Sequence, residues 1–93
     1  MDFKRSRPEQ VRLEVLTQCY GYRPGSRDAE HMASLARRDG EIADAVPAEF
    51  ETEAAYLAGK GLVEILQEEL AKGHKRYKIT SAGIDYLEAN GLV

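Results

Sequence analysis

Cysteine and histidine are scarce in this sequence of 93 residues, which contains one cysteine and two histidines. A single thiol, Cys19, cannot form a disulfide within the chain, so the composition fits a reducing compartment. His31 and His74 have no partner at the spacing of a metal site, such as Cys-x-x-Cys or His-x-x-x-His. No phosphate-binding glycine loop, nucleophile elbow or catalytic dyad is present. We therefore expect no enzyme activity, no metal site and no cofactor.

Long apolar runs are also absent, since no stretch of about 18 apolar residues occurs and the first residues do not resemble a signal peptide. We expect a cytoplasmic protein that does not contact a membrane. Charged residues make up 31% of the chain and hydrophobic residues 43%, as in ordinary globular proteins. The length suits one domain over residues 1–93, with residues 1–7 as an N-terminal arm.

The net charge of −3 conceals an uneven distribution. Residues 1–27 contain six Lys or Arg against three Asp or Glu, and residues 71–93 contain four against two. Residues 28–70 contain three against eleven. The two ends are therefore basic and the middle is acidic, which bears directly on binding to nucleic acid.

Helical periodicity, caps and glycine breaks predict the order of the elements. They are a helix from Ser6-Arg7-Pro8-Glu9 to Gly21, a helix from Arg27 to Arg38 capped by Ser26 or Asp28, a short helical turn from Glu41 to Val46, a helix from Pro47 to Gly59, strands from Leu62 to Leu66 and from Arg76 to Ile79 joined by a turn at 72–75, and a helix capped by Thr80-Ser81. The expected core places Phe50, Ala54 and Leu57 against Val15, Leu16, Leu35, Ile65, Ile79 and Ile84.

This order predicts an α+β, mostly helical fold of the winged-helix class, with a three-helix core, a two-stranded β-wing and a C-terminal helix. Two segments carry a closer resemblance. The segment Ala54–Ile65 resembles the end of a winged-helix third helix and the first wing strand. The segment Lys75–Leu87 resembles the second wing strand and closing helix of many bacterial regulators, with their Leu/Ile-Thr-x-x-Gly turn. The chain is thus similar to multiple-antibiotic-resistance-type regulators and to small winged-helix proteins of Mu-like phages.

The resemblance implies binding to DNA, as a small bacterial transcriptional regulator or a phage-type accessory factor. A winged helix places its third helix, here with Thr52 on the exposed side, in the major groove. Basic residues in two clusters would contact phosphate. They are Lys72, His74, Lys75, Arg76 and Lys78 in the wing, and Arg5, Arg7 and Arg12 at the first helix. If both clusters lie on one side, they can hold the backbone without the third helix. Alternatively, the wing cations only protect an exposed strand edge.

A second hypothesis is that the protein is a protein-interaction module. Glu49, Glu51 and Glu53 on the predicted third helix would repel phosphate, and no Lys or Arg occurs from Asp39 to Gly59. In this reading the acids and Tyr56 face a basic protein partner or a second copy in a homodimer. A third alternative is an acidic helix face that is simply solvated.

Overall fold

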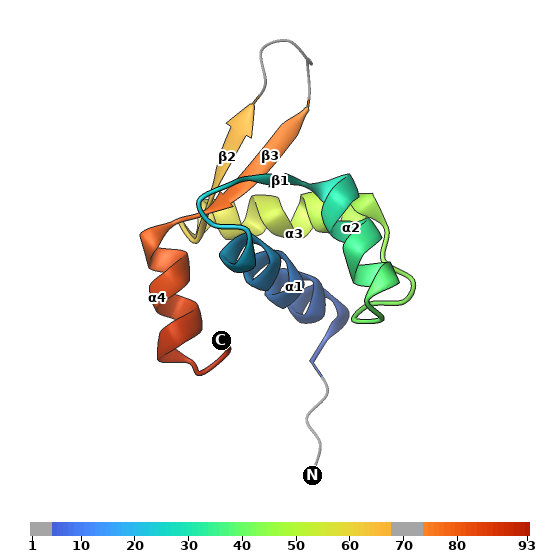
Figure 1. Ribbon diagram of the computed structural model, residues 1–93, viewed down its shortest axis with the longest axis horizontal. Coiled ribbons are helices and arrows are strands. Elements are labelled where there is room, and N and C mark those ends of the chain that lie inside the picture. The colour runs from blue at the N-terminus through green and yellow to red at the C-terminus, as the bar shows by residue number, and fades with distance from the viewer. Residues whose placement is uncertain (1–4, 68–73) are drawn as a thin grey trace.

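Helices α1, α2 and α3 form the body of the molecule, and strands β2 and β3 rise from it as a hairpin (Figure 1). The structure, a computed structural model, describes residues 5–67 and 74–93. The elements are α1 (Arg7–Gly21), β1 (Arg27–Asp28), α2 (Ala29–Arg38), α3 (Pro47–Gly59), β2 (Val63–Gln67), β3 (Lys75–Ile79) and α4 (Ser81–Ala89). Helix α4 lies to one side of the body and follows directly from β3 (Figure 1).

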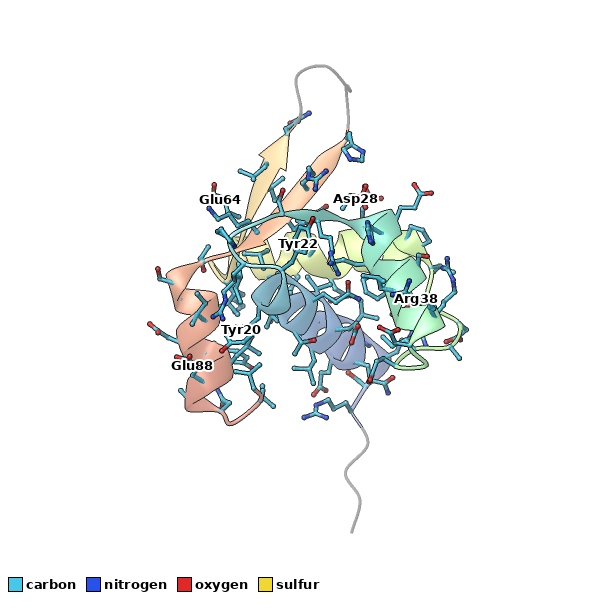
Figure 2. All side chains as sticks on the ribbon, viewed as in Figure 1. Tyr20, Tyr22, Asp28, Arg38, Glu64 and Glu88 are labelled. Carbon is cyan, nitrogen blue, oxygen red and sulfur yellow. The ribbon has the colours of Figure 1, made fainter. Side chains whose placement is uncertain are left out.

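Local capping signals begin the helices as the sequence predicts. The Ser6 hydroxyl accepts a hydrogen bond from the Glu9 amide at the start of α1, and Thr80 accepts one from the Gly83 amide at the start of α4. Asp28, rather than Ser26, caps α2 by accepting from the His31 amide (Figure 2). The predicted start of this helix at Arg27 is wrong, because Arg27 and Asp28 are extended and form β1.

The described sheet has three strands in the order β1-β3-β2, all antiparallel. Arg27 and Asp28 lie opposite Tyr77 and Arg76, so β1 adds a short third strand to the predicted two-stranded wing. Strand β2 aligns Val63 with Ile79. The strands lie within one residue of their predicted bounds. The sequence could not reveal β1, because two residues are too few for a periodic pattern.

Buried side chains from all three body helices and the sheet meet in one core. Phe50, Ala54 and Leu57 are buried as predicted, and Leu57 is 3% exposed. Ile79, Val15 and Leu16 join them, whereas Leu35 and Ile84 are half-buried. The prediction for Ile65 is wrong: it is 39% exposed although it lies opposite the buried Tyr77, because β2 is an edge strand of the sheet. The remaining buried hydrophobic residues of the described chain are Val11, Cys19, Ala29, Met32, Ala33, Ala36, Ile42, Ala45, Val63, Tyr77 and Leu87.

The connection between α2 and α3, residues 39–46, packs against the body despite its polar sequence. Ile42 and Ala45 are buried in the core, and Arg37 Nη1 donates a 2.6 Å hydrogen bond to the Ala45 carbonyl oxygen. The predicted helical turn is wrong, since the segment forms bends and a turn, and Val46 is 45% exposed. The backbone of this connection follows an irregular path, and this path, rather than a helical period, determines which of its residues are buried.

Gly83 explains the Thr-x-x-Gly turn that closes the wing. A Cβ atom at this position would collide with the Leu62 carbonyl oxygen and come within 2.7 Å of the Ile79 Cγ1 atom. The Thr80 amide donates to the same Leu62 carbonyl at 3.2 Å, so the first turn of α4 lies directly against the entry to β2. The elements follow the order α1-β1-α2-α3-β2-β3-α4, so the β2–β3 hairpin comes directly after α3 in the chain. This is the arrangement of the winged-helix fold.

Candidate nucleic-acid interface

Four exposed positions of α3 share one helix face and carry mostly small side chains. Ala48, Glu51, Thr52 and Ala55 are exposed and recur at the i, i+3, i+4, i+7 spacing of one helix face. The Thr52 hydroxyl donates a 3.0 Å hydrogen bond to the Ala48 carbonyl oxygen in the preceding turn. Glu51 therefore supplies the only charge among these four positions.

Glu49 turns toward α1 and pairs with Arg7. The guanidinium of Arg7 donates from Nε and Nη2 to the two carboxylate oxygens of Glu49, at 2.6 and 2.9 Å. Its Nη1 also donates to Asp44 at 2.7 Å. The hydrogen bonds from Arg7 hold the pKa of Glu49 and the pKa of Asp44 below their usual ranges. One predicted phosphate-binding cation thus neutralises acids of the same chain.

Glu53 forms a second pair of the same kind with Arg12. Arg12 Nε lies 2.7 Å from Glu53 Oε1, and the Glu53 side chain is only 14% exposed. The Arg12 guanidinium also stacks on the Tyr56 ring, 3.8 Å from its centroid. The pairs Arg7–Glu49 and Arg12–Glu53 occur in the same order along both helices, so they fix α1 beside α3.

The three glutamates therefore do not form one acidic surface, which corrects the interpretation that Glu49, Glu51 and Glu53 face a partner together. At 3.6 residues per turn, Glu49 and Glu53 are about 40° apart around the helix, whereas Glu51 is about 160° from each. Helical phase alone separates Glu51 from the other two acids. Their partners in α1 could not be identified in this way, because the contacts are not local.

Two predicted wing residues lie close to Glu51. His74 Nε2 is 3.3 Å from an oxygen of Asp28, the residue that caps α2 (Figure 2). Lys75 is exposed and lines, together with His74 and Glu51, a depression of about 160 Å³ between β3 and the first turns of α2 and α3. The wing thus brings the cation of Lys75 and the imidazole of His74 to the edge of the exposed face of α3, where Asp28 and Glu30 also line the depression.

The other predicted wing residues have different surroundings. Arg76 donates to the Ser26 hydroxyl at 2.9 Å and to the Ser26 carbonyl at 2.7 Å, which fastens β3 to the segment before β1. Lys78 is half-buried and lies opposite Glu64 in the strand register (Figure 2). Lys72 lies outside the described residues. Of this group, Lys75 has the exposure and position that best suit a phosphate contact.

The basic cluster of α1 does not lie beside the wing. Helix α1 begins on the side of the body away from β2 and β3 (Figure 1). Arg5 is exposed and lines a groove of about 530 Å³ between α1, the end of α3 and α4. This groove, which sequence reasoning missed, also includes Arg12, Lys60, Tyr56 and Tyr86. The two basic clusters are therefore not brought together into one backbone-binding surface.

Cys19 is a core residue rather than a reactive thiol. It is 1% exposed, and burial raises the pKa of its thiol to about 11, so the thiol stays protonated at neutral pH. Among residues 5–67 and 74–93, no group of three His, Cys, Asp or Glu side chains is arranged to hold a metal ion. None of the helices in this part of the chain has the length and apolarity needed to cross a membrane.

Comparison with known proteins supports the fold. No family model matches the chain, and no curated protein matches its sequence. Among solved structures, the chain is similar to a transcriptional regulator from Clostridium thermocellum, with a TM-score of 0.71. The match covers 86% of this chain and 77% of that chain at 18% sequence identity. At this identity the likeness concerns the fold alone.

Proposed function

We propose that this protein is a small winged-helix DNA-binding protein that regulates transcription. In this proposal the exposed face of α3 enters the major groove, and the wing lies beside the phosphate backbone. The observation that carries it is the pairing of Glu49 and Glu53 with Arg7 and Arg12. These pairs neutralise two of the three acids on α3 that would otherwise oppose approach to phosphate. The transcriptional regulator of similar fold supports the same class of function.

We further propose that the protein is a small bacterial regulator of the antibiotic-resistance type or a phage accessory factor. The turn from Thr80 to Gly83 supports this assignment. The sequence resemblance includes this turn, and the contact of Gly83 with Leu62 gives it a structural role. We extend the proposal to one domain over residues 1–93 that acts in the cytoplasm. In this proposal Lys75 is the principal phosphate contact among the residues that the structure describes. His74, Lys78 and Lys72, the last of which lies outside the described residues, are close to it in sequence.

The alternative of a basic protein partner or a homodimer, bound through the acids of α3, has less support. Glu49 and Glu53 already have partners within the chain. The surface would depend on Glu51 and Tyr56, which lie about 140° apart around the helix. A flat partner surface on one side of α3 would therefore not contact both.

A salt-dependent titration of the full chain with a random-sequence duplex tests the proposal. Fluorescence anisotropy should give an affinity that falls as salt rises, with a linear dependence on a logarithmic scale, because phosphate contacts release counterions. The Lys75→Ala variant should reduce the slope by about one unit, the value for one lost contact. Absence of binding at the lowest salt would overturn the proposal.

The matched control for Lys75→Ala is Lys60→Ala. Lys60 is also exposed, but it follows the last residue of α3 and lines the groove with α4 instead of the depression that Lys75 lines. Its substitution removes the same charge and should leave the salt dependence of DNA affinity equal to that of the parent protein. Equal reductions in both variants would show that net charge, rather than the wing, determines binding.

A further inference from the structure

Four exposed positions of α3, Ala48, Glu51, Thr52 and Ala55, offer hydrogen-bond acceptors and no free side-chain donor. The hydroxyl-bearing Tyr56 is also exposed, but it lies about 140° around the helix from Glu51. Ala48 and Ala55 have no polar atoms, and the hydroxyl proton of Thr52 is used within the helix, on the Ala48 carbonyl. Thr52 retains acceptor lone pairs, and Glu51 presents an ionised carboxylate, which only accepts. This inventory restricts which base edges α3 can bind.

Only two major-groove groups can donate to such a face, the amino groups of cytosine and adenine. Guanine presents two acceptors, N7 and O6, which a carboxylate repels. Adenine places its N7 acceptor next to its amino group, so a carboxylate that approaches the amino group also meets a lone pair. Cytosine has no acceptor beside N4 on its own major-groove edge. A carboxylate therefore suits cytosine best.

Glu51 is the acid of α3 that is placed to make this contact. Glu49 and Glu53 are turned toward Arg7 and Arg12. Glu51 is exposed, and within the described part of the chain no ion pair holds its carboxylate. Lys75 lines the same depression, and its positive charge reduces the repulsion between this carboxylate and nearby phosphates, although Asp28 and Glu30 also line it.

We infer that Glu51 is the specificity-determining residue of α3 and that it reads a cytosine through the N4 amino group. The inference rests on the proposed DNA-binding function. Ala48, Thr52 and Ala55 add methyl groups on the same face, and these suit the C5-methyl group of thymine. The bound site should therefore contain a cytosine next to A·T pairs whose thymine methyl groups face α3.

Selection of bound duplexes from a randomised pool, with the full chain, tests the inference. The parent should enrich cytosine at one fixed position. The Glu51→Gln variant should change that preference toward adenine, because an amide can bind N6 and N7 of adenine together. The cytosine-to-adenine ratio at this position is expected to change by roughly 5- to 150-fold, the range for one base-specific contact.

Glu88→Gln is the matched control, since it removes the same charge from an exposed position on α4, outside the proposed interface (Figure 2). This variant should keep the cytosine preference of the parent. An unchanged preference in Glu51→Gln, or an enriched parental site without cytosine, would overturn the inference while DNA binding stands. If the parent retains no duplex at all, the proposed function and the inference fail together, so the two failures are distinguishable.

Discussion

Glu49 accepts two hydrogen bonds from Arg7, a residue 42 positions earlier in the chain. A carboxylate on α3 and a guanidinium on α1 thereby neutralise each other, and Asp44 adds a third member to the group. The basic start of the sequence and the acidic third helix thus supply residues of opposite charge that pair with each other in the fold. The exposed face of α3 carries much less negative charge than the sequence suggests.

The Arg7 pairs should make stability depend on pH in the acid range. Glu49 and Asp44 have folded-state pKa values below their ordinary values of 4.5 and 3.8, chiefly because Arg7 donates hydrogen bonds to them. For a lowered pKa, the stabilisation is complete above the unfolded value and is lost as pH falls through the folded value. The parent should therefore lose its stability advantage over Arg7→Gln as pH decreases below the ordinary values.

Urea unfolding at a series of pH values measures this difference. Burial raises the pKa of Glu14, which acts in the opposite direction, but Glu14 is present in both proteins and cancels in the comparison. An advantage of the parent that stays constant from neutral pH to pH values well below the ordinary pKa values would contradict the pairing.

Arg12→Ala should destabilise the fold by about 1–2 kcal/mol, because it removes both the pair with Glu53 and the stacking on Tyr56. Arg38 provides the matched control. Its pair with Asp39 is 3.6 Å long, and its side chain is 74% exposed, so Arg38→Ala should change stability by about 0.5 kcal/mol or less. Thermal unfolding of both variants is the measurement, and equal melting temperatures would contradict the account of Arg12.

Gly83→Ala should cost about 1–3 kcal/mol or more, because the added methyl group meets the Leu62 carbonyl. The same substitution at Gly59 should have the opposite sign. Gly59 is the last residue of α3, and nothing lies within 4 Å of an added Cβ atom, so alanine should stabilise the helix by about 0.5 kcal/mol or less. Chemical denaturation of both variants compares them, and a stable Gly83→Ala protein would show that α4 does not pack closely on β2.

Leu57→Ala should cost about 2–5 kcal/mol, because the side chain is buried among the body helices and the sheet. Ile65→Ala should cost about 1 kcal/mol or less, since Ile65 is 39% exposed on β2. Equilibrium unfolding gives both values. Similar losses at the two positions would mean that the wing folds back onto the body.

Local sequence patterns predicted most of the helices and strands, but they could not predict contacts between segments that are distant in the sequence. The caps at Ser6, Asp28 and Thr80 satisfy amides three residues away, so the sequence around each contains the signal. Strand β1 depends on pairing with β3, which comes some fifty positions later. Its two residues have no pattern of their own.

The candidate site shows the same division. The separation of Glu51 from Glu49 and Glu53 follows from helical phase and could be predicted from the sequence. The partners of those two acids could not, because a residue on α1 gives no local sign of which part of α3 it contacts. Likewise, the role of Arg76 in binding Ser26 depends on the packing of β3 beside β1.

An NMR titration with a short random-sequence duplex at low salt tests the central claim most directly. DNA binding through α3 and the wing should shift the amide signals of Glu51, Thr52 and Ala55 and of Lys75 most strongly. The control region is the groove between α1 and α4, where the signals of Lys60 and Tyr86 should change little. Shifts concentrated in that groove, or no shifts at all, would contradict the account.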